Sequence, residues 1–448
     1  MYILSEWRNQ LEIGSIHDDD SHYAVLAIAL ASGQGYRQIN FPGSPPEVAF
    51  PPLYPLFLAF IRTLFPNSLA VLKWASIPMT LTALVLIWTE VRRIDPILSQ
   101  IVTAVLAFHP QFAFFATMAL SEPLFLVLTL LAFRAVRSYL AHNPYHGPSL
   151  GIASMLVTLA YLTRFVGIAL LPASLLFGCL ARKWRHVLLL ALVTLLLCIP
   201  WSIRNYLLFG YLFLPTQEQI WTSGIVEQMD GVYVKFGTTW QDRASIALKQ
   251  VIYYGTQLIP ETVLRFLNSP TLNKVVEQTN LQIAQRLVAL AIPGLILLGL
   301  ATDGYTRKIP DISAIFLIIY LGGIVLWPFR EQGRFLYPVL PFLLGYFALG
   351  VKVAANALVR RLPWARARRG LLWLVGLLIL LVILIPNLRE DIRCIWTDPP
   401  SRYTPRIEPA GVWIRANTPQ DAVLLTENPF WVFLYTGRLT VPFPYNTP

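Results

Sequence analysis

Three consecutive carboxylates, Asp18, Asp19 and Asp20, stand near the start of the chain, just before a short helix-like run. A segment rich in glycine and proline follows, closed by the sequence FPPLYP at 50–55. A well-placed carboxylate can remove the proton of an attacking hydroxyl as a general base. An acidic cluster beside apolar segments is costly to hold, which favours a functional role. A solvated loop at the rim of a membrane protein explains the cluster equally well.

A further carboxylate and four arginines could take part in the same chemistry. Glu122 stands where two apolar segments meet, Arg164 and Arg204 each end an apolar segment, and Arg330 and Arg334 lie four residues apart. Each arginine also has a structural explanation, because a guanidinium at a helix end can extend toward water or pair with a carboxylate. Guanidiniums can take up the charge of a departing lipid phosphate while a carboxylate activates an acceptor hydroxyl. Since a base must stay ionised, we expect the acidic cluster in a wetted loop.

The composition shows what surrounds these residues. The chain has 448 residues, of which 56% are hydrophobic and 13% charged, and its mean hydropathy is +0.57. Soluble domains average roughly 25% charged residues, so we expect a multi-pass membrane protein. The sequence contains no P-loop, no GxGxxG motif and no zinc-like spacing, and its three cysteines form no disulfide pattern. The candidate membrane spans are 69–90, 97–117, 122–140, 149–163, 165–181, 187–206, 286–302, 312–329, 335–352 and 371–387.

The basic residues predict the orientation of these spans. The net charge of +11 does not indicate a nucleic-acid partner, because the arginines and lysines gather in the short loops after the first, third, fifth, seventh and ninth spans. The positive-inside rule makes these loops cytoplasmic. The protein is therefore predicted in the cytoplasmic (inner) membrane, with the acidic cluster on the extracytoplasmic side, beyond the reach of cytosolic nucleotide-sugars. No helix carries the N-terminus across, and the sequence stops abruptly at Pro448, so we expect a fragment at both ends.

The predicted fold is an all-α polytopic helical bundle with extracytoplasmic interfacial helices and a small, incomplete α/β domain at the C-terminus. The C-terminal segment shows a helix pattern at 409–417, strands at 422–426 and near 439–442, and a helical stretch after Asn428-Pro429. The predicted parts are a first extracytoplasmic loop (1–66), membrane helices (67–206), a loop with interfacial helices (207–285), membrane helices (286–387) and a soluble domain (388–448).

The order of these motifs resembles that of the GT-C glycosyltransferases. The likeness is closest to the protein-mannosyltransferase-like group (glycosyltransferase family 39) and its bacterial relatives, the aminoarabinose transferases of lipid A. It covers nearly the whole chain, and the shared order makes the set more specific than any single motif. The motifs are DDSHY at 19–23, Gly33 with Gly35-Tyr36, FPPLYP at 50–55, SEPLF at 121–125, Thr163-Arg164, PWSIRN at 200–205, RFLYP at 334–338, Trp413-Ile414 with NTP at 417–419, and LYTGR at 434–438.

The resemblance implies a GT-C-like bundle and an inverting transfer of a sugar from a polyprenyl-phosphate donor to an acceptor hydroxyl. It implies Asp19 as the base and Asp20 as its acidic neighbour, with Asp18 leaving an ambiguity of one residue. Glu122 would position the acceptor or a divalent ion. The remaining implied roles are donor-phosphate binding by Arg204, Arg330, Arg334 and Arg164, and lining of the substrate pocket by Tyr23, Tyr54 and Tyr337.

Other functions stay open at this point. A lipid or solute transporter explains the helices, but transporters usually carry functional charges near the membrane midplane in repeated halves. An inactive envelope scaffold and a polymerase or ligase using pyrophosphate-linked donors are further alternatives. His17 and His22 flank the acids, which leaves a divalent metal ion open, and no other cofactor is indicated. The sugar and the acceptor, whether protein, lipid or glycan, are not specified.

Overall fold

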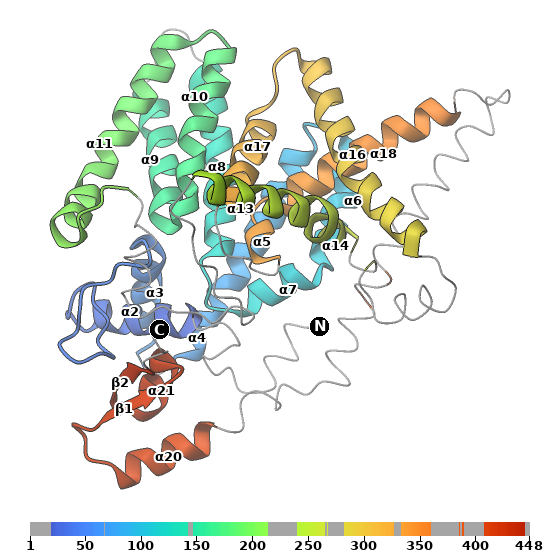
Figure 1. Cartoon of the computed structure of the whole chain (residues 1–448). Helices are drawn as coiled ribbons and strands as arrows, with labels where there is room; N and C mark the ends of the chain where they lie inside the picture. Colours follow the sequence, from blue (N-terminus) through green and yellow to red (C-terminus); the bar gives the residue numbers. More distant parts are fainter. Residues whose placement is uncertain are drawn as a thin grey trace.

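The structure is a computed structural model that describes residues 19–66, 68–141, 147–213, 240–264, 267, 282–326, 333–359, 385, 388 and 407–443. In this part of the chain, helices form the membrane bundle and a small sheet lies below it (Figure 1). Asp18, Arg330 and nearly all of the predicted span 371–387 lie outside the described residues.

The bundle confirms the predicted class. Five described helices are long and apolar enough to cross a membrane, or six if a bent pair counts as one span, so the chain is a multi-pass membrane protein. Helices α11 and α16 expose rows of leucine, as lipid-facing helices do. The bundle contains α4 (Ala70–Trp74), α5 (Ser76–Val91), α6 (Pro96–Ala107), α7 (Pro110–Thr117), α8 (Glu122–Ala141), α9 (Gly147–Thr163), α10 (Leu170–Leu180), α11 (Trp184–Phe209), α16 (Gln282–Arg307), α17 (Ile312–Leu326) and α18 (Leu340–Val359).

The predicted span 97–117 is two helices, not one. Helix α6 ends at Ala107, and α7 begins at Pro110 with a bend of 57° between them. Proline disfavours a helical conformation in the residue before it, so His109 is extended. The His109 side chain then caps α7 by accepting a hydrogen bond from the backbone N–H of Gln111. The sequence already contained this signal in its His-Pro step.

The chain also breaks at Arg164, before the predicted span 165–181. Arg164 is extended, and a short 3₁₀ helix, η1 (Phe165–Ala169), leads into α10. Gly167 allows η1 to approach α9, because a Cβ at this position would overlap the carbonyl oxygen of Ala160. The break directs the Arg164 side chain away from the regular helix path and toward α8.

The acidic segment is helical from Asp19 onward. Helix α2 (Asp19–Ala31) contains both Asp19 and Asp20 in its first turn, whereas the sequence predicted the acids before a surface helix at 22–32. The helix is apolar around most of its circumference, and such a helix is buried. It packs against α3 (Leu53–Leu64), whose Leu56, Phe60 and Leu64 stay exposed as in an interfacial helix.

Within the predicted loop 207–285, the structure describes residues 207–213, 240–264, 267 and 282–285. The loop contains α13 (Trp240–Tyr253), a π-helical turn η2 (Tyr254–Leu258) and α14 (Ile259–Val263). Helix α13 crosses in front of α17 in Figure 1 and contacts it. Its position relative to a membrane surface stays a prediction.

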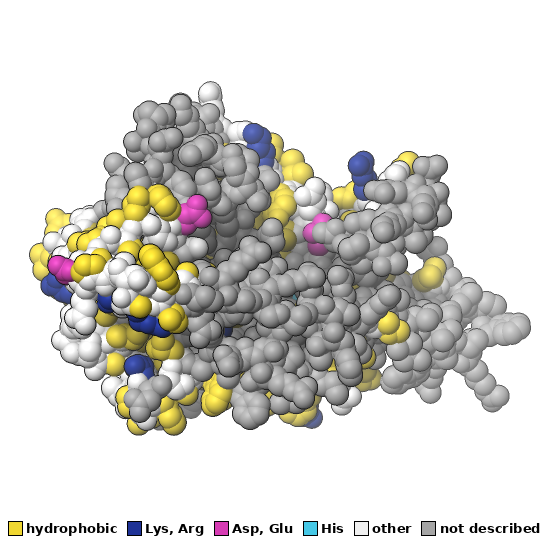
Figure 2. All heavy atoms as spheres, turned by 90° about the horizontal axis from the view of Figure 1, so that it is seen from below, with side chains coloured by type: hydrophobic (Ala, Val, Ile, Leu, Met, Phe, Trp, Pro, Cys, Tyr) yellow, Lys and Arg dark blue, Asp and Glu magenta, His cyan; other side chains and the backbone are white. Residues whose placement is uncertain are grey.

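The C-terminal part is a small α/β unit, as predicted. It comprises α20 (Ile407–Asn417), β1 (Val423–Thr426), α21 (Pro429–Thr436) and β2 (Leu439–Pro442). The two strands pair in parallel, with Val423 opposite Leu439, because α21 carries the chain from one strand to the next. Figure 2 shows the molecule from below, the side on which this unit lies in Figure 1, and the described surface there carries both hydrophobic and charged side chains.

Candidate active site

Four of the predicted site residues meet at one end of the bundle. Asp19 begins α2, Glu122 begins α8, Arg164 lies at the break before η1, and Arg334 begins the short 3₁₀ helix η4 (Arg334–Leu336). Nη2 of Arg334 lies 2.6 Å from Oδ2 of Asp19, and its Nε donates to Oε1 of Glu122. Nη1 of Arg164 lies 2.6 Å from the same Glu122 oxygen. We call these four residues the acid centre.

The acid centre is buried and electrically balanced. Glu122 and Arg334 have side chains 0% and 8% exposed, whereas the side chain of Asp19 is 20% exposed. Two carboxylates face two guanidiniums, which is how buried charges are normally tolerated. Burial raises the pKa of Asp19, but Arg334, with smaller contributions from His22 and Arg164, lowers it by more, so that pKa lies below its usual range. Asp19 therefore stays ionised without the wetted loop that the sequence predicted.

The other acid and two of the tyrosines lie beside this centre. Asp20 is fully buried, and its Oδ1 accepts from the backbone N–H of Ser21 at 2.8 Å. The Tyr23 hydroxyl lies 3.0 Å from Oγ of Ser121, which also accepts from Arg164 at 3.1 Å. The ring of Tyr54 packs edge-on against Tyr23, with 4.8 Å between ring centroids. Of the two described aspartates of the acidic cluster, Asp19 is the more accessible, because its side chain is 20% exposed and Asp20 is fully buried.

Tyr337 is placed differently. It is fully buried, and its ring lies 4.6 Å from that of Phe112 and 4.5 Å from that of Phe115, between centroids. The residue packs η4 against α7. Its predicted role in lining a substrate pocket stays a prediction.

Glu47 is a buried polar hub that the sequence reasoning missed. Its Oε2 lies 2.6 Å from Nε2 of His22 and 2.9 Å from Nε2 of Gln38, and its Oε1 accepts from the backbone N–H groups of Ala49 and Phe50. Burial raises the pKa of Glu47, but His22 and these hydrogen bonds lower it by a larger amount. The pKa of Glu47 therefore lies below its usual range. A single glutamate between two prolines and an apolar run was the available signal.

A buried lysine was also missed. Lys73 lies on α4 and is 6% exposed, and α4 contacts both α3 and α7. Lysine is almost never fully buried without a role or a partner. The sequence analysis placed it inside the predicted span 69–90 and gave it no role.

Arg204 does not join the acid centre. It donates to the backbone oxygen of Glu47 at 2.8 Å and to Oδ1 of Asn205 at 3.0 Å. Its guanidinium carbon lies over three aromatic rings, 4.6 Å from the centroid of Trp201, 5.4 Å from Tyr36 and 5.3 Å from Phe209. Within the described residues no carboxylate pairs with Arg204. Its charge is therefore available to an anion.

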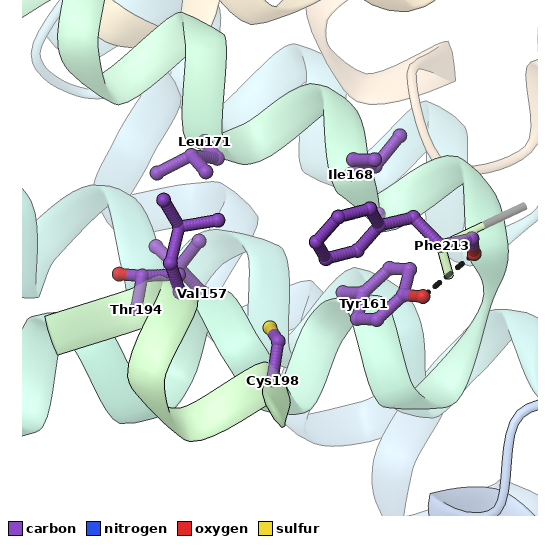
Figure 3. A pocket seen from close by; sticks show the side chains of 9 residues that line it. Val157, Tyr161, Ile168, Leu171, Thr194, Cys198 and Phe213 are labelled. Atoms are coloured by element: carbon purple, nitrogen blue, oxygen red, sulfur yellow. Dashed lines mark hydrogen bonds between the residues drawn. The ribbon is translucent and has the colours of Figure 1, made fainter. Parts of the chain in front are cut away.

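An apolar cavity of about 100 Å³ lies between α9, α10 and α11 (Figure 3). Cys198, Trp201 and Tyr161 form one packed cluster there, and Tyr36 and Phe213 pack against it. The cavity is thus joined through this cluster to the rings that surround Arg204. Its lining suits hydrocarbon and includes Val157, Tyr161, Ile168, Leu171, Thr194 and Cys198.

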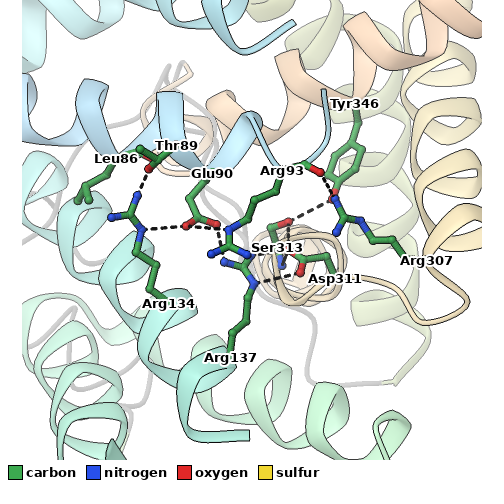
Figure 4. Close-up of polar contacts among 10 residues, drawn as sticks. All are labelled: Leu86, Thr89, Glu90, Arg93, Arg134, Arg137, Arg307, Asp311, Ser313 and Tyr346. Carbon is green, nitrogen blue, oxygen red and sulfur yellow. Dashed lines mark hydrogen bonds and ion pairs between the residues drawn. The ribbon is translucent and has the colours of Figure 1, made fainter. Parts of the chain in front are cut away.

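A second ion-pair network lies at the other end of α8 (Figure 4). Glu90 accepts from Arg134 at 3.0 Å and from Arg137 at 2.5 Å, and Arg137 also pairs with Asp311 at 2.5 Å. Fifteen residues separate Glu122 from Arg137, so the two networks are about 22 Å apart along the helix. Basic residues of the predicted cytoplasmic loops therefore gather at one end of the bundle and the acid centre at the other.

The donor set of the described residues does not favour the metal site that the sequence left open, and His17 lies outside these residues. Among the described residues, no three His, Cys, Asp or Glu side chains are grouped so that they could hold a metal ion. The carboxylates of Asp19 and Glu122 accept from guanidiniums, and His22 is bound to Glu47. A divalent ion bound by these side chains would have to displace one of these pairs.

Comparisons with known proteins identify the fold. No protein-family model matches the sequence, and no curated protein matches it. The structure is similar to ArnT from Cupriavidus metallidurans bound to undecaprenyl phosphate, with a TM-score of 0.60 and 14% identity over 98% of this chain and 83% of that one. It is also similar to the Archaeoglobus fulgidus oligosaccharyltransferase complex with zinc and sulfate, with a TM-score of 0.60 and 14% identity over 99% of this chain.

The oligosaccharyltransferase AglB from Archaeoglobus fulgidus, in complex with an inhibitory peptide and a dolichol-phosphate, is similar as well, with a TM-score of 0.58 and 17% identity. The chain spans 62% and 63% of the length of the two oligosaccharyltransferase chains. These likenesses confirm the fold that the motif order predicted. The chain has the fold of the GT-C membrane glycosyltransferases, with a small α/β unit at its C-terminal end.

Proposed function

We propose that the protein is an inverting glycosyltransferase that moves a sugar from a polyprenyl-phosphate donor to an acceptor hydroxyl. The observation that carries the proposal is the acid centre, in which Asp19 is ionised, partly accessible and held by Arg334 beside Glu122. The fold supports it, because ArnT and AglB were solved with undecaprenyl phosphate and a dolichol-phosphate. The proposal extends this lipid-phosphate chemistry from those proteins to this chain.

In the proposed reaction, the carboxylate of Asp19 takes the proton of the acceptor hydroxyl as its oxygen attacks the anomeric carbon. The bond from that carbon to the phosphate oxygen breaks, and the polyprenyl phosphate leaves with the bonding electrons. Attack opposite the leaving group inverts the configuration. Arg334 and Arg164 hold the acids, since their charges are already balanced, and Arg204 takes up the charge of the departing phosphate.

The apolar cavity beside the aromatic cluster of Arg204 has room for a short stretch of the donor's hydrocarbon chain, with the rest of the chain in the lipid. Apolar chain carbons placed there would be shielded from water while the phosphate stays at the guanidinium. This arrangement separates the phosphate-binding charge from the acid centre. Arg330 lies outside the described residues, so its predicted role in phosphate binding stays a prediction.

We further propose that the acid centre faces the extracytoplasmic side of the cytoplasmic membrane. The support is the grouping of Arg93, Arg134, Arg137 and Arg307 at the opposite end of the bundle, where the positive-inside rule expects basic residues. The acceptor remains a protein, a lipid or a glycan in this proposal.

The test is a transfer assay in membranes that contain the protein, with a panel of radiolabelled polyprenyl-phosphate sugars. Asp19→Asn should lower the rate by about 10²–10⁴-fold, the usual contribution of a general base. Asp421→Asn, at an exposed aspartate, is the matched control and should keep full activity. Loss in Asp20→Asn but not in Asp19→Asn would move the base by one residue. No transfer from any donor by the folded wild type would favour the transporter alternative.

A further inference from the structure

The C-terminal unit contacts the helix that carries the acids. Helix α21 packs on α2, and Phe430 is 4% exposed at this contact. The Phe430 ring stacks on the His22 ring with 3.7 Å between centroids and 15° between planes. Phe50 meets the His22 ring edge-on at 4.7 Å. The imidazole is therefore held between one ring from the first loop and one from the C-terminal unit.

His22 is also fixed within its ring plane. Its Nε2 lies 2.6 Å from Oε2 of Glu47, whose other oxygen is bound to the backbone of the 47–50 segment. Stacking and hydrogen bonding act in perpendicular directions, so together they leave the ring one orientation. His22 stands three residues after Asp19, and residues three apart lie on the same side of a helix.

A separate contact ties the sheet to the first loop. The backbone N–H of Thr440 donates to the carbonyl oxygen of Asn40 at 2.8 Å, and Nδ2 of Asn40 lies 3.4 Å from Oγ1 of Thr440. Val25, Ile39 and Phe41 complete an apolar cluster around Phe430. The C-terminal unit is thus anchored to α2 and to the loop that follows it.

We propose that Phe430 is a positioning residue that keeps the first turn of α2, and with it Asp19, in place against Arg334. The inference rests on the proposed function for its effect on rate. Phe430 acts through His22, on which its ring stacks. Without the ring, α2 loses the packing on one face of His22, and the ion pair between Asp19 and Arg334 loosens. Misplacement of a reacting group by about 1 Å can lower a rate by 10²-fold.

The test compares Phe430→Ala and Phe430→Leu with Trp413→Ala. Trp413 is an aromatic residue of the same unit but is 62% exposed, so its removal should change nothing. We expect Phe430→Ala to lower kcat by about 10- to 100-fold with little change in the KM for the donor. Phe430→Leu keeps an apolar side chain and should fold normally, with an intermediate loss of kcat.

Two readouts separate positioning from general damage. The groups facing Asp19 are Arg334, Arg164, His22 and Glu122. If Asp19 moves away from Arg334, the acidic limb of the pH–rate profile shifts to higher pH, because a carboxylate without its cation ionises less readily. Hydrogen exchange of the α2 amides should also become faster in both Phe430 variants and stay unchanged in Trp413→Ala.

Hydrogen exchange keeps the inference independent of the proposed activity. If the wild type transfers no sugar, faster exchange confined to α2 and the 36–50 loop still supports the role of Phe430, while the proposed function fails. Wild-type kcat in Phe430→Ala, or unchanged exchange in α2, would overturn the inference.

Discussion

Replacing Arg334 with methionine removes the guanidinium shared by Asp19 and Glu122 and keeps an unbranched side chain. Glu122 retains Arg164 at 2.6 Å, but Asp19 loses its ion pair. Two unit charges 4 Å apart attract by about 4 kcal/mol at an effective dielectric constant of 20, and breaking a buried pair costs roughly 3–5 kcal/mol. Because Asp19 is partly exposed, we expect the lower end, a loss of about 3 kcal/mol in the free energy of unfolding.

The same change should alter the pH dependence of transfer. Arg334 lowers the pKa of Asp19 against the raising effect of burial, so in Arg334→Met the carboxylate ionises only at higher pH. The acidic limb of the pH–rate profile should therefore move to higher pH in Arg334→Met. The assay is the rate of sugar transfer from about pH 3 to about pH 8, so that the acidic limb of the wild type is included, with thermal unfolding of the same samples.

The matched control is Arg185→Met, at an exposed arginine near the start of α11. It removes the same charge from the surface and should leave both the melting temperature and the acidic limb unchanged. An unchanged acidic limb in Arg334→Met, in a folded protein that still transfers sugar, would refute the reasoning that this guanidinium keeps Asp19 ionised.

Three further predictions concern stability. Glu90→Gln should lower the free energy of unfolding by about 1–3 kcal/mol, because it removes the buried carboxylate shared by Arg134 and Arg137 while Arg137 keeps Asp311, and kcat of the folded fraction should stay at the wild-type value because the acid centre is far away. Gly350→Ala should lower the melting temperature, since a Cβ would overlap the carbonyl oxygen of Leu295 where α18 meets α16. The pKa values of Asp19 and Glu47 are lowered on folding, so the stability they contribute is present above about pH 4 and is lost as pH falls further, which melting curves across pH can measure.

Much of the fold followed from apolar segment lengths and turn residues. The spans starting at Glu122 and Ile312, and both strands of the C-terminal unit, begin within one residue of the predicted positions. Hydrophobic length and strand alternation are local properties, so the sequence carries them directly. The break at His109 was missed because the apolar run continues through Pro110, and composition outweighed the backbone preference of the proline step.

The site was predicted only in part, for a physical reason. Motif order placed Asp19, Glu122, Arg164 and Arg334 in one region, and they do form one network. The sequence could not show that Arg204 stands apart from them, because the side on which a guanidinium lies depends on how helices pack.

Glu47 was missed for a similar reason. Two of its four hydrogen bonds come from the neighbouring backbone N–H groups of Ala49 and Phe50, and the other two come from Gln38 and His22, which the fold brings to it. An isolated glutamate in a loop carries no periodic pattern that could reveal a buried role.

The contact between Asn40 and Thr440 also has a consequence for biosynthesis. The two residues are 400 positions apart in the chain. At about 5–20 residues per second, a ribosome would finish the second partner roughly 20–80 s after the first. Helix α2 therefore leaves the ribosome long before the unit that covers it exists. During that interval, the insertion machinery or transient contacts within the chain must cover the apolar surface of α2 and its aspartates. The order of the sequence thus makes the contact of the C-terminal unit with α2 and the first loop one of the last to form.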